Sequence, residues 1–155
     1  MKISTQSRYG LRALFDIAYH SAGLSTQVKD ISARQGISPR YIEQIFQKLK
    51  RAGLVKSLRG PSGGYYLARS PEEIKVGDVI RATEVNLDLV FCLSHNKSAT
   101  KSCDRAVHCV ARDVWLEASG RLMEYLDSVT LQDLCMRAQH RGIERSIDKH
   151  LMYYI

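Results

Sequence analysis

The sequence predicts a mainly α-helical protein that carries one small β-hairpin. Three helical patterns follow one another in the first third of the 155 residues, a glycine-rich hairpin comes directly after them, and a long apolar stripe lies in the second half. The order helix, turn, helix, hairpin is that of a winged helix-turn-helix. Few residues of the same chain remain for the long stripe to pack against. It therefore predicts a dimerisation helix that pairs with a second copy.

The first two helices are expected over residues 7–22 and 28–35. Ser25 and Thr26 are candidate N-caps for the second of them, because their hydroxyls can accept from free amides of the first turn. Gly36 suits the position just past its end, where the backbone turns left-handed.

The third helix begins with strong signals. Ser38 is a good N-cap, and Pro39 fits the first helical position, where a missing N–H costs nothing. The expected buried stripe comprises Ile42, Ile45, Phe46 and Leu49, and the outward face carries Arg40, Tyr41, Gln44, Gln47, Lys48 and Arg51. In a major groove such side chains reach base edges and phosphates, although an ordinary amphipathic helix with a basic outer face has the same pattern.

A β-hairpin is expected directly after this helix. Residues 54–58 and 65–68 read as its strands, and Arg59-Gly60-Pro61-Ser62-Gly63-Gly64 as its tip. A hairpin in this place is a wing, whose Arg59 is positioned to enter a narrow minor groove. A nucleotide-binding glycine loop is disfavoured, because no Lys-Ser/Thr follows and no helix starts at the glycines.

The second half has a different composition. Residues 70–73 read as a capped turn, residues 76–84 as a short helix and residues 89–106 as an irregular loop. The long helix is expected over residues 107–128, with Thr130 and Asp133 as a capping box for a last helix. Its apolar stripe comprises Val107, Ala111, Val114, Ala118, Leu122 and Tyr125, widened by Trp115 and Leu126.

Charge is distributed unevenly between the two halves. Residues 1–69 carry 12 Lys/Arg against 3 Asp/Glu, a net charge of +9, whereas residues 70–155 carry 11 against 13, a net charge of −2. A basic half joined to a nearly neutral one suggests a nucleic-acid-binding face with a separate structural or sensing part. No apolar run reaches the ~20 residues of a membrane span, and no secretory signal is apparent, so a cytoplasmic location with no membrane partner is expected.

Three segments carry a resemblance to a known family. They are Met1-Lys2-Ile3-Ser4 with Ser7-Arg8-Tyr9-Gly10, the stretch Ile37-Ser38-Pro39-Arg40-Tyr41-Ile42-Glu43-Gln44, and the wing Arg59-Gly60-Pro61-Ser62-Gly63-Gly64-Tyr65. Together they resemble the family of winged-helix regulators that includes the iron–sulphur cluster regulator IscR, the nitric-oxide sensor NsrR and the cysteine-metabolism regulator CymR, with the likeness strongest to IscR-like members. The resemblance covers roughly residues 1–135 and implies a homodimer that binds a pseudo-palindromic operator in double-stranded DNA.

The resemblance also assigns DNA-facing residues. It implies that Arg59 and its neighbours, Ser62 among them, probe the minor groove, and that the third helix faces the major groove with Ser38, Arg40, Tyr41 and Gln44. Lys48, on the outward face of the same helix, is a further candidate for DNA contact. Glu43 belongs to the same face, where a carboxylate repels phosphates unless a cytosine amino group donates to it. It therefore penalises DNA sequences that do not satisfy it.

Three of the four cysteines lie where IscR-like and NsrR-like members hold an iron–sulphur cluster. The resemblance implies a Cys-x5-Cys-x5-Cys spacing, as in those members. Here ten residues separate Cys92 from Cys103 and five separate Cys103 from Cys109. The resemblance implies a labile cluster, and we favour a two-iron, two-sulphur cluster. Free thiols and a zinc ion are the alternatives to it. The fourth cysteine, Cys135, is expected to be a packing residue.

The fourth cluster ligand is open. The resemblance to IscR-like members implies a histidine three residues beyond the third cysteine as the fourth ligand. That position is Arg112 here, which stays protonated and cannot ligate metal. His108 is our first candidate, with His95 or a carboxylate as alternatives. The carboxylate that NsrR-like members use near the N-terminus is replaced by Arg8.

Three regions follow from these observations: a DNA-binding domain over residues 1–84, a cysteine-containing cluster-binding loop over 85–106, and a dimerisation helix with a C-terminal helix over 107–155. The expected function is a dimeric transcription regulator, not an enzyme, whose operator binding the cluster controls and which regulates genes for cluster biogenesis. The alternative keeps the fold without a cluster, as a CymR-like repressor controlled by a partner protein, a metabolite or thiol redox state. A thiol enzyme is a third class, disfavoured because no Cys-x-x-Cys occurs in the sequence.

Overall fold

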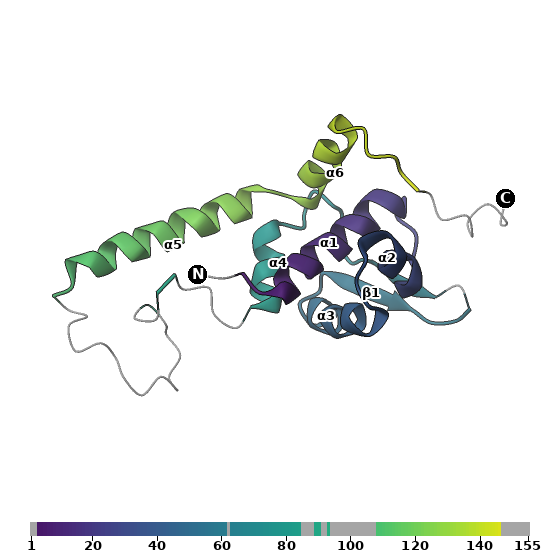
Figure 1. The fold of residues 1–155 in the computed structure, drawn as a ribbon, viewed down its shortest axis with the longest axis horizontal. Helices are drawn as coiled ribbons and strands as arrows, with labels where there is room; N and C mark the ends of the chain where they lie inside the picture. The colour runs from purple at the N-terminus through teal and green to yellow at the C-terminus, as the bar shows by residue number, and fades with distance from the viewer. Residues whose placement is uncertain (1–2, 62, 85–88, 91–92, 94–107, 147–155) are drawn as a thin grey trace.

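The computed structural model describes residues 3–61, 63–84, 89–90, 93 and 108–146. Figure 1 shows a cluster of helices with a hairpin, from which one long helix extends. The elements, in chain order, are α1 (Thr5–His20), α2 (Val28–Gln35), α3 (Pro39–Arg51), β1 (Val55–Leu58), β2 (Gly64–Leu67), α4 (Val76–Thr83), α5 (Val110–Ser128) and α6 (Leu131–His140). The predicted fold class, mainly helical with a wing and a long second-half helix, is confirmed.

One apolar core holds α1, α2, α3, the hairpin and α4 together. The predicted inner stripe of α3 is fully buried, with Ile42, Phe46 and Leu49 at 0% exposure and Ile45 at 1%. It packs against Leu14 and Ile17 of α1 in the same cluster. Gly10 allows the closest approach, because a Cβ there would lie only 3.3 Å from Ile45 Cγ2 and 3.5 Å from Thr83 Cγ2. Helices α1, α3 and α4 therefore meet with almost no free space between them.

Helix α1 starts two residues earlier than expected because Ser4 caps it. The Ser4 hydroxyl accepts from the backbone N–H of Ser7 at 3.2 Å, which satisfies one free amide of the first turn. Helix α4 ends at Thr83 rather than Glu84, whose backbone is already extended.

The N-cap expected for α2 is wrong. The cap residue is Gln27, whose side chain makes no capping bond, and neither Ser25 nor Thr26 takes that position. Thr26 instead exchanges two backbone hydrogen bonds with Tyr65 of β2, at 2.8 and 2.9 Å. Backbone pairing with the hairpin replaces the side-chain cap, and only the tertiary fold provides that partner. Gly36 does adopt the predicted left-handed conformation, with φ of 63°.

The hairpin pairs β1 and β2 antiparallel, with Val55 opposite Leu67 and Leu58 opposite Gly64. Both strands lie within a residue of their predicted bounds. Gly64 is required by its surroundings, since a Cβ there would clash with the carbonyl of Thr26. The hairpin is thus attached directly to the segment before α2.

An ion pair links α4 to the C-terminal end of α5. Arg81 of α4 donates to Asp127 at 2.7 and 3.1 Å and to Asp78 at 2.9 Å. The hydrogen bonds from Arg81 lower the pKa of Asp127, against the opposing effect of burial. Gly77 makes the crossing possible, because a Cβ there would overlap the Asp127 carboxylate.

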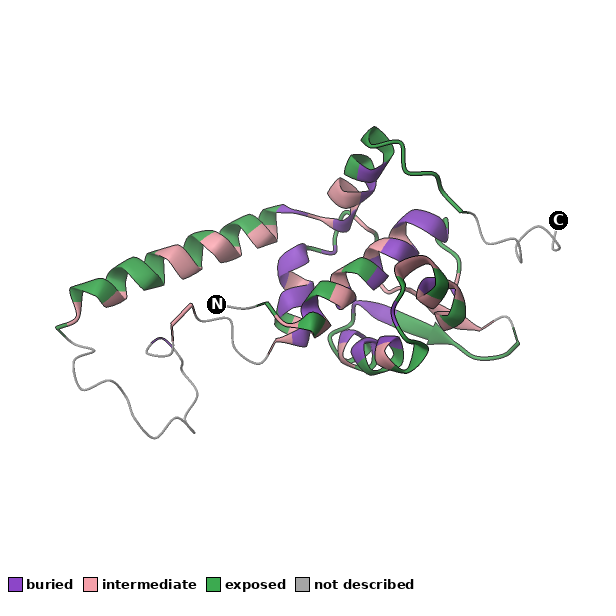
Figure 2. Cartoon of the chain, viewed as in Figure 1, coloured by how far each residue is buried: buried purple, intermediate pink, exposed green. Residues whose placement is uncertain are grey.

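Helix α5 has no buried residue along its described length. Figure 2 shows it in the colours of exposed and intermediate residues only, in contrast to the core helices. Among its exposed apolar side chains are Val110 at 80%, Val114 at 61% and Trp115 at 44%. The helix was expected from residue 107, which lies outside the described residues together with the rest of 94–107.

Helix α6 returns to the core and packs on α1. Thr130 and Asp133 form the predicted capping box, with Asp133 N–H donating to Thr130 Oγ1 at 3.1 Å. Cys135 is 3% exposed and lies in a small cluster with Tyr19 and Ala138, which confirms its expected packing role. Burial raises the pKa of the Cys135 thiol, with smaller effects of nearby charges.

Candidate nucleic-acid interface and cysteine segment

The outward face of α3 is exposed at its N-terminal end. Ser38, Arg40, Glu43 and Gln44 are all exposed, whereas the opposite side of the same helix is the core stripe. Ser38 is the N-cap by backbone conformation, but its side chain makes no capping hydrogen bond. Four of the predicted DNA-facing side chains thus lie on one accessible surface of the helix expected to enter the major groove.

Tyr41 has a more enclosed position than its neighbours. It is half-buried, and its ring meets the ring of Tyr9 edge to face at 5.8 Å. Arg12 lies over the Tyr9 ring at 5.4 Å on the way to α2, where its guanidinium donates to Gln35. Tyr41 therefore contributes to the contact between α3 and α1 and keeps part of its surface exposed.

Lys48 is half-buried and hydrogen-bonded within the protein, and its predicted contact with DNA stays a prediction. Its ammonium donates to Gln6 Oε1 and, at 3.4 Å, to the carbonyl of Thr83. It thereby joins α3 to the start of α1 and the end of α4.

The wing lies directly beside α3. Lys50 of α3 donates to Ser57 of β1 at 2.7 Å, and Gln27 donates to the carbonyl of Pro61 in the hairpin tip at 3.2 Å. Arg59 is exposed at the base of this tip, as predicted. Ser62 lies outside the described residues.

A tyrosine of the wing contacts α3. The Tyr65 ring meets the ring of Phe46 at 4.6 Å. The pKa of Tyr65 is raised, first by burial and then by the negative charge of Glu43. The Glu43 carboxylate therefore lies near the wing strand as well as on the exposed face of α3.

Of the predicted cluster ligands, the structure describes Cys109 and His108. Cys109 is the N-cap residue of α5, half-buried and free, and its side chain makes no capping hydrogen bond. His108 is exposed. Cys92, Cys103 and His95 lie outside the described residues. Within the described residues, no three His, Cys, Asp or Glu side chains converge closely enough to hold a metal ion.

Arg112 lies one helical turn beyond Cys109. Its backbone N–H donates to the carbonyl of Cys109 at 3.0 Å. Its side-chain Nε is buried and has no hydrogen-bond partner in the described structure. A buried donor without an acceptor is costly.

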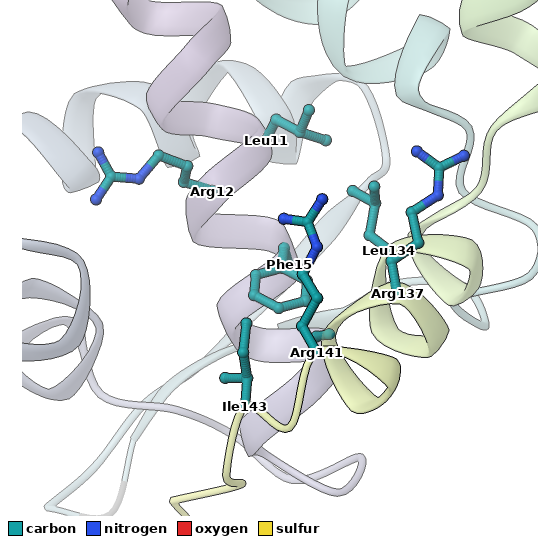
Figure 3. Close-up of a pocket in the computed structure, with 8 residues that line it drawn as sticks. Leu11, Arg12, Phe15, Leu134, Arg137, Arg141 and Ile143 are labelled. Atoms are coloured by element: carbon teal, nitrogen blue, oxygen red, sulfur yellow. The ribbon is translucent and has the colours of Figure 1, made fainter.

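A groove lies between α1 and α6 (Figure 3). Its floor is apolar, with Leu11, Phe15 and Leu134, and Ile143 closes one end. Arg12, Arg137 and Arg141 line it as well, and none of the three forms an ion pair within the described residues. The groove offers apolar contact together with unneutralised positive charge.

Sequence reasoning missed the hydrogen-bond cluster at the end of α4. The Glu84 carboxylate accepts from Ser4 and Ser7, and the Ser7 hydroxyl also lies 2.7 Å from Thr83 Oγ1. Lys48 donates to the carbonyl of Thr83. The four hydroxyl and carboxyl residues come from opposite ends of the DNA-binding part, so no local pattern joins them. The one available signal in the sequence was Lys48, a lysine near the edge of the buried stripe of α3.

An exposed polar helix beside a basic hairpin defines a winged-helix DNA-binding protein. The chain belongs to the Rrf2 family, whose model is described as an iron-dependent transcriptional regulator and matches residues 3–137. It is a DNA-binding transcriptional regulator of this family.

Relatives agree on this class. The chain is 41% identical over 134 residues to the HTH-type transcriptional regulator IscR of Aliivibrio salmonicida, covering 86% of this chain and 77% of that protein. It is 36% identical to IscR of Vibrio cholerae, covering 97% and 84%. These relatives are named as regulators, not as enzymes.

Solved structures show the same fold. A structure of T. potens IscR matches with a TM-score of 0.73 and 38% identity, over 99% of this chain and 97% of that one. The structure of CymR, the global cysteine regulator of B. subtilis, matches with a TM-score of 0.71 and 35% identity, over 88% and 98%. Within the described residues, no helix combines the length and apolarity needed to cross a membrane.

Proposed function

We propose that this protein is a dimeric transcription regulator whose operator binding is controlled by a labile iron–sulphur cluster of the two-iron, two-sulphur type. The proposed ligands are Cys92, Cys103 and Cys109, with His108 as the fourth. The observation that carries the DNA-binding part is the exposed face of α3 beside the wing. The proposed organisation is a DNA-binding domain over residues 1–84, a cluster-binding loop over 85–106 and a dimerisation region over 107–155, with cluster-biogenesis genes as targets.

Direct readout is assigned to the N-terminal turns of α3. Arg40 and Gln44 are exposed and carry the donors that read guanine and adenine edges in a major groove. Glu43, exposed between them, accepts from a cytosine amino group in the correct sequence and repels the backbone in others. Lys48 acts mainly on the position of α3, because its ammonium already has partners within the protein.

Arg59 provides the first test of this interface. Replacing it by alanine is expected to weaken operator binding by about 1–3 kcal/mol and to reduce the salt dependence of the affinity. The reason is that the substitution removes a positively charged side chain from the minor groove of the DNA. Fluorescence anisotropy titrations at several salt concentrations measure both quantities.

The matched control is Arg69→Ala. Arg69 follows the other strand end of the same hairpin, 3.6 Å from Asp78, and is not proposed to touch DNA. Equal effects of the two substitutions on affinity and salt slope would contradict the assignment of Arg59.

The exposed apolar face of α5 supports the homodimer. A single copy leaves Val110, Val114, Trp115 and Tyr125 in contact with water, and a second α5 is a partner with the same stripe. The α1–α6 groove fits the same occupant. The first half of α5 carries the exposed acid Asp113, which complements the arginines of the groove.

The described residues fit a thiolate-held cluster at Cys109. Cys109 is the N-cap residue of α5, where free backbone amides of the first helical turn can donate to the sulphur atoms of a bound group. The buried Arg112 Nε adds a donor without an acceptor beside it. When bound, the cluster would supply an iron centre sensitive to oxidation and to iron supply. Cys109 would hold it, and Arg112 would balance its negative charge.

Cys109→Ala and Cys135→Ala form a matched pair for the cluster. Protein purified and reconstituted without oxygen is expected to contain iron and sulphide and to absorb visible light. Cys109→Ala is expected to lose most of both, whereas Cys135→Ala is expected to keep them, because Cys135 is buried in the α1–α6 contact. Iron and sulphide analysis with an absorption spectrum measures the outcome.

The match to CymR favours a second candidate, a regulator of the same fold without a cluster. Wild-type protein that contains no iron after reconstitution, yet binds DNA as a dimer, would contradict the cluster and support this candidate.

A further inference from the structure

A hydrogen-bond cluster holds the residue at which the chain leaves the DNA-binding part. Glu84 Oε1 accepts from the backbone N–H of Ser4 at 2.7 Å and from the hydroxyl of Ser7 at 2.5 Å. Ser7 is fully buried and also lies 2.7 Å from Thr83 Oγ1. Charge-assisted bonds of this kind are about twice as strong as neutral ones, so Glu84 is held firmly.

The same hydrogen-bond cluster includes a residue of α3. Lys48 of α3 donates to Gln6 of α1 and to the carbonyl of Thr83, the residue before Glu84. Burial would raise the pKa of Glu84, but hydrogen bonds from Ser7 and Ser4 and the charge of Lys48 together lower it. The carboxylate is therefore charged and paired at neutral pH. Three elements, α1, α3 and α4, meet at this one point.

Close packing makes the connection stiff. At Gly10 the contact between α1, Ile45 of α3 and Thr83 of α4 is tight enough that a Cβ would lie within 3.3–3.5 Å of both neighbours. A shift of Thr83 and Glu84 therefore cannot be absorbed by empty space and displaces α3 relative to α1.

The position of Glu84 in the chain suggests a role for this hydrogen-bond cluster. It is the last residue before the region proposed to hold the cluster, and Cys92 follows eight residues later. We propose that Glu84 is a positioning residue that transmits the state of the cysteine-containing region to α3 through Ser7, Thr83 and Lys48. This proposal rests on the proposed function, because it needs a cluster that changes state.

The test compares two forms of each protein. Wild type, Glu84→Gln and Ser7→Ala are prepared as full-length dimers, with cluster and without it. Their affinities are measured by anisotropy on a duplex that the wild-type protein enriches from a random-sequence library. The quantity of interest is the ratio of the two dissociation constants, which is the coupling between cluster and DNA.

For wild type we expect a ratio of roughly 5 to 150. In both variants it is expected to fall toward one, with the iron and sulphide content unchanged. A merely structural role for Glu84 would weaken both forms equally and leave the ratio at its wild-type value, which would overturn the proposal.

Glu73→Gln is the matched control. Its carboxylate also accepts from a serine N–H and hydroxyl, those of Ser70 at 3.1 Å each, but in an exposed turn away from α3. Its ratio is expected to stay at the wild-type value, and an equal loss there would overturn the assignment to Glu84.

The amides of α3 give a second readout. Hydrogen exchange over residues 39–51 is expected to differ between the two forms of wild type and to be alike in the two forms of Glu84→Gln. Absence of iron from the wild type marks failure of the proposed function itself. If the DNA affinity of the wild type depends on the iron–sulphur cluster, and that of Glu84→Gln depends on it equally, this inference alone fails.

Discussion

Replacing Val114 by aspartate is expected to give a monomer that binds a palindromic operator roughly 10²- to 10⁴-fold more weakly, because the two half-sites are no longer bound by one linked molecule. Val114 is 61% exposed in the single chain, so the substitution costs the protomer little. In the proposed dimer the same position is covered by a second α5, where an unpaired carboxylate is strongly unfavourable. Sedimentation gives the oligomeric state, and anisotropy gives the affinity.

Gly120→Asp is the matched control for this substitution. It adds the same charge to the same helix, but on the side opposite the apolar stripe, and a Cβ there has no neighbour within 4 Å. It is expected to remain a dimer with nearly unchanged operator affinity. If Val114→Asp also stays dimeric, α5 is not the dimerisation helix.

Phe46→Ala is expected to lower the free energy of unfolding by about 3–5 kcal/mol. Phe46 is fully buried on α3 and also meets the Tyr65 ring at 4.6 Å. The substitution therefore leaves a cavity in the core and removes the contact that fixes the wing against the recognition helix. Urea unfolding followed by circular dichroism, at one fixed protomer concentration, measures the loss.

Phe46→Leu is the graded control. It keeps an apolar side chain of similar size, and its cost is expected to stay below about 1.5 kcal/mol. Equal losses for alanine and leucine would mean that the site collapses around the smaller side chain and does not set the position of the wing.

Local signals were sufficient for most of the fold. The stripe of Ile42, Ile45, Phe46 and Leu49, the left-handed Gly36 and the Thr130–Asp133 box each follow from spacing or backbone preference within a few residues. Their structural causes are local as well, which is why sequence reasoning found them.

The features that sequence reasoning missed depend on distant partners. Thr26 pairs with Tyr65 instead of capping α2, because the hairpin arrives 39 residues later and supplies backbone partners. The bonds from Ser4 and Ser7 to Glu84 span 80 and 77 residues. Lys48 was assigned to DNA from its place on α3, and only the folded structure shows which groups surround its ammonium.

For the candidate site, the residues proposed to face DNA were accessible to pattern reasoning, and the proposed cluster ligands were less so. Arg40, Glu43, Gln44 and Arg59 are exposed where the helix and hairpin patterns put them. Cysteine spacing indicates only which thiols lie near one another in the chain, and the choice of a fourth ligand depends on how the region folds around the metal.

The central claim is that one dimer reads DNA differently with and without its cluster. The direct measurement is the operator affinity of wild-type protein in both forms, on the same duplex and at the same salt concentration. Our account predicts dissociation constants that differ by roughly 5- to 150-fold between the two forms. Equal affinities in a protein that demonstrably holds its iron and sulphide would contradict it.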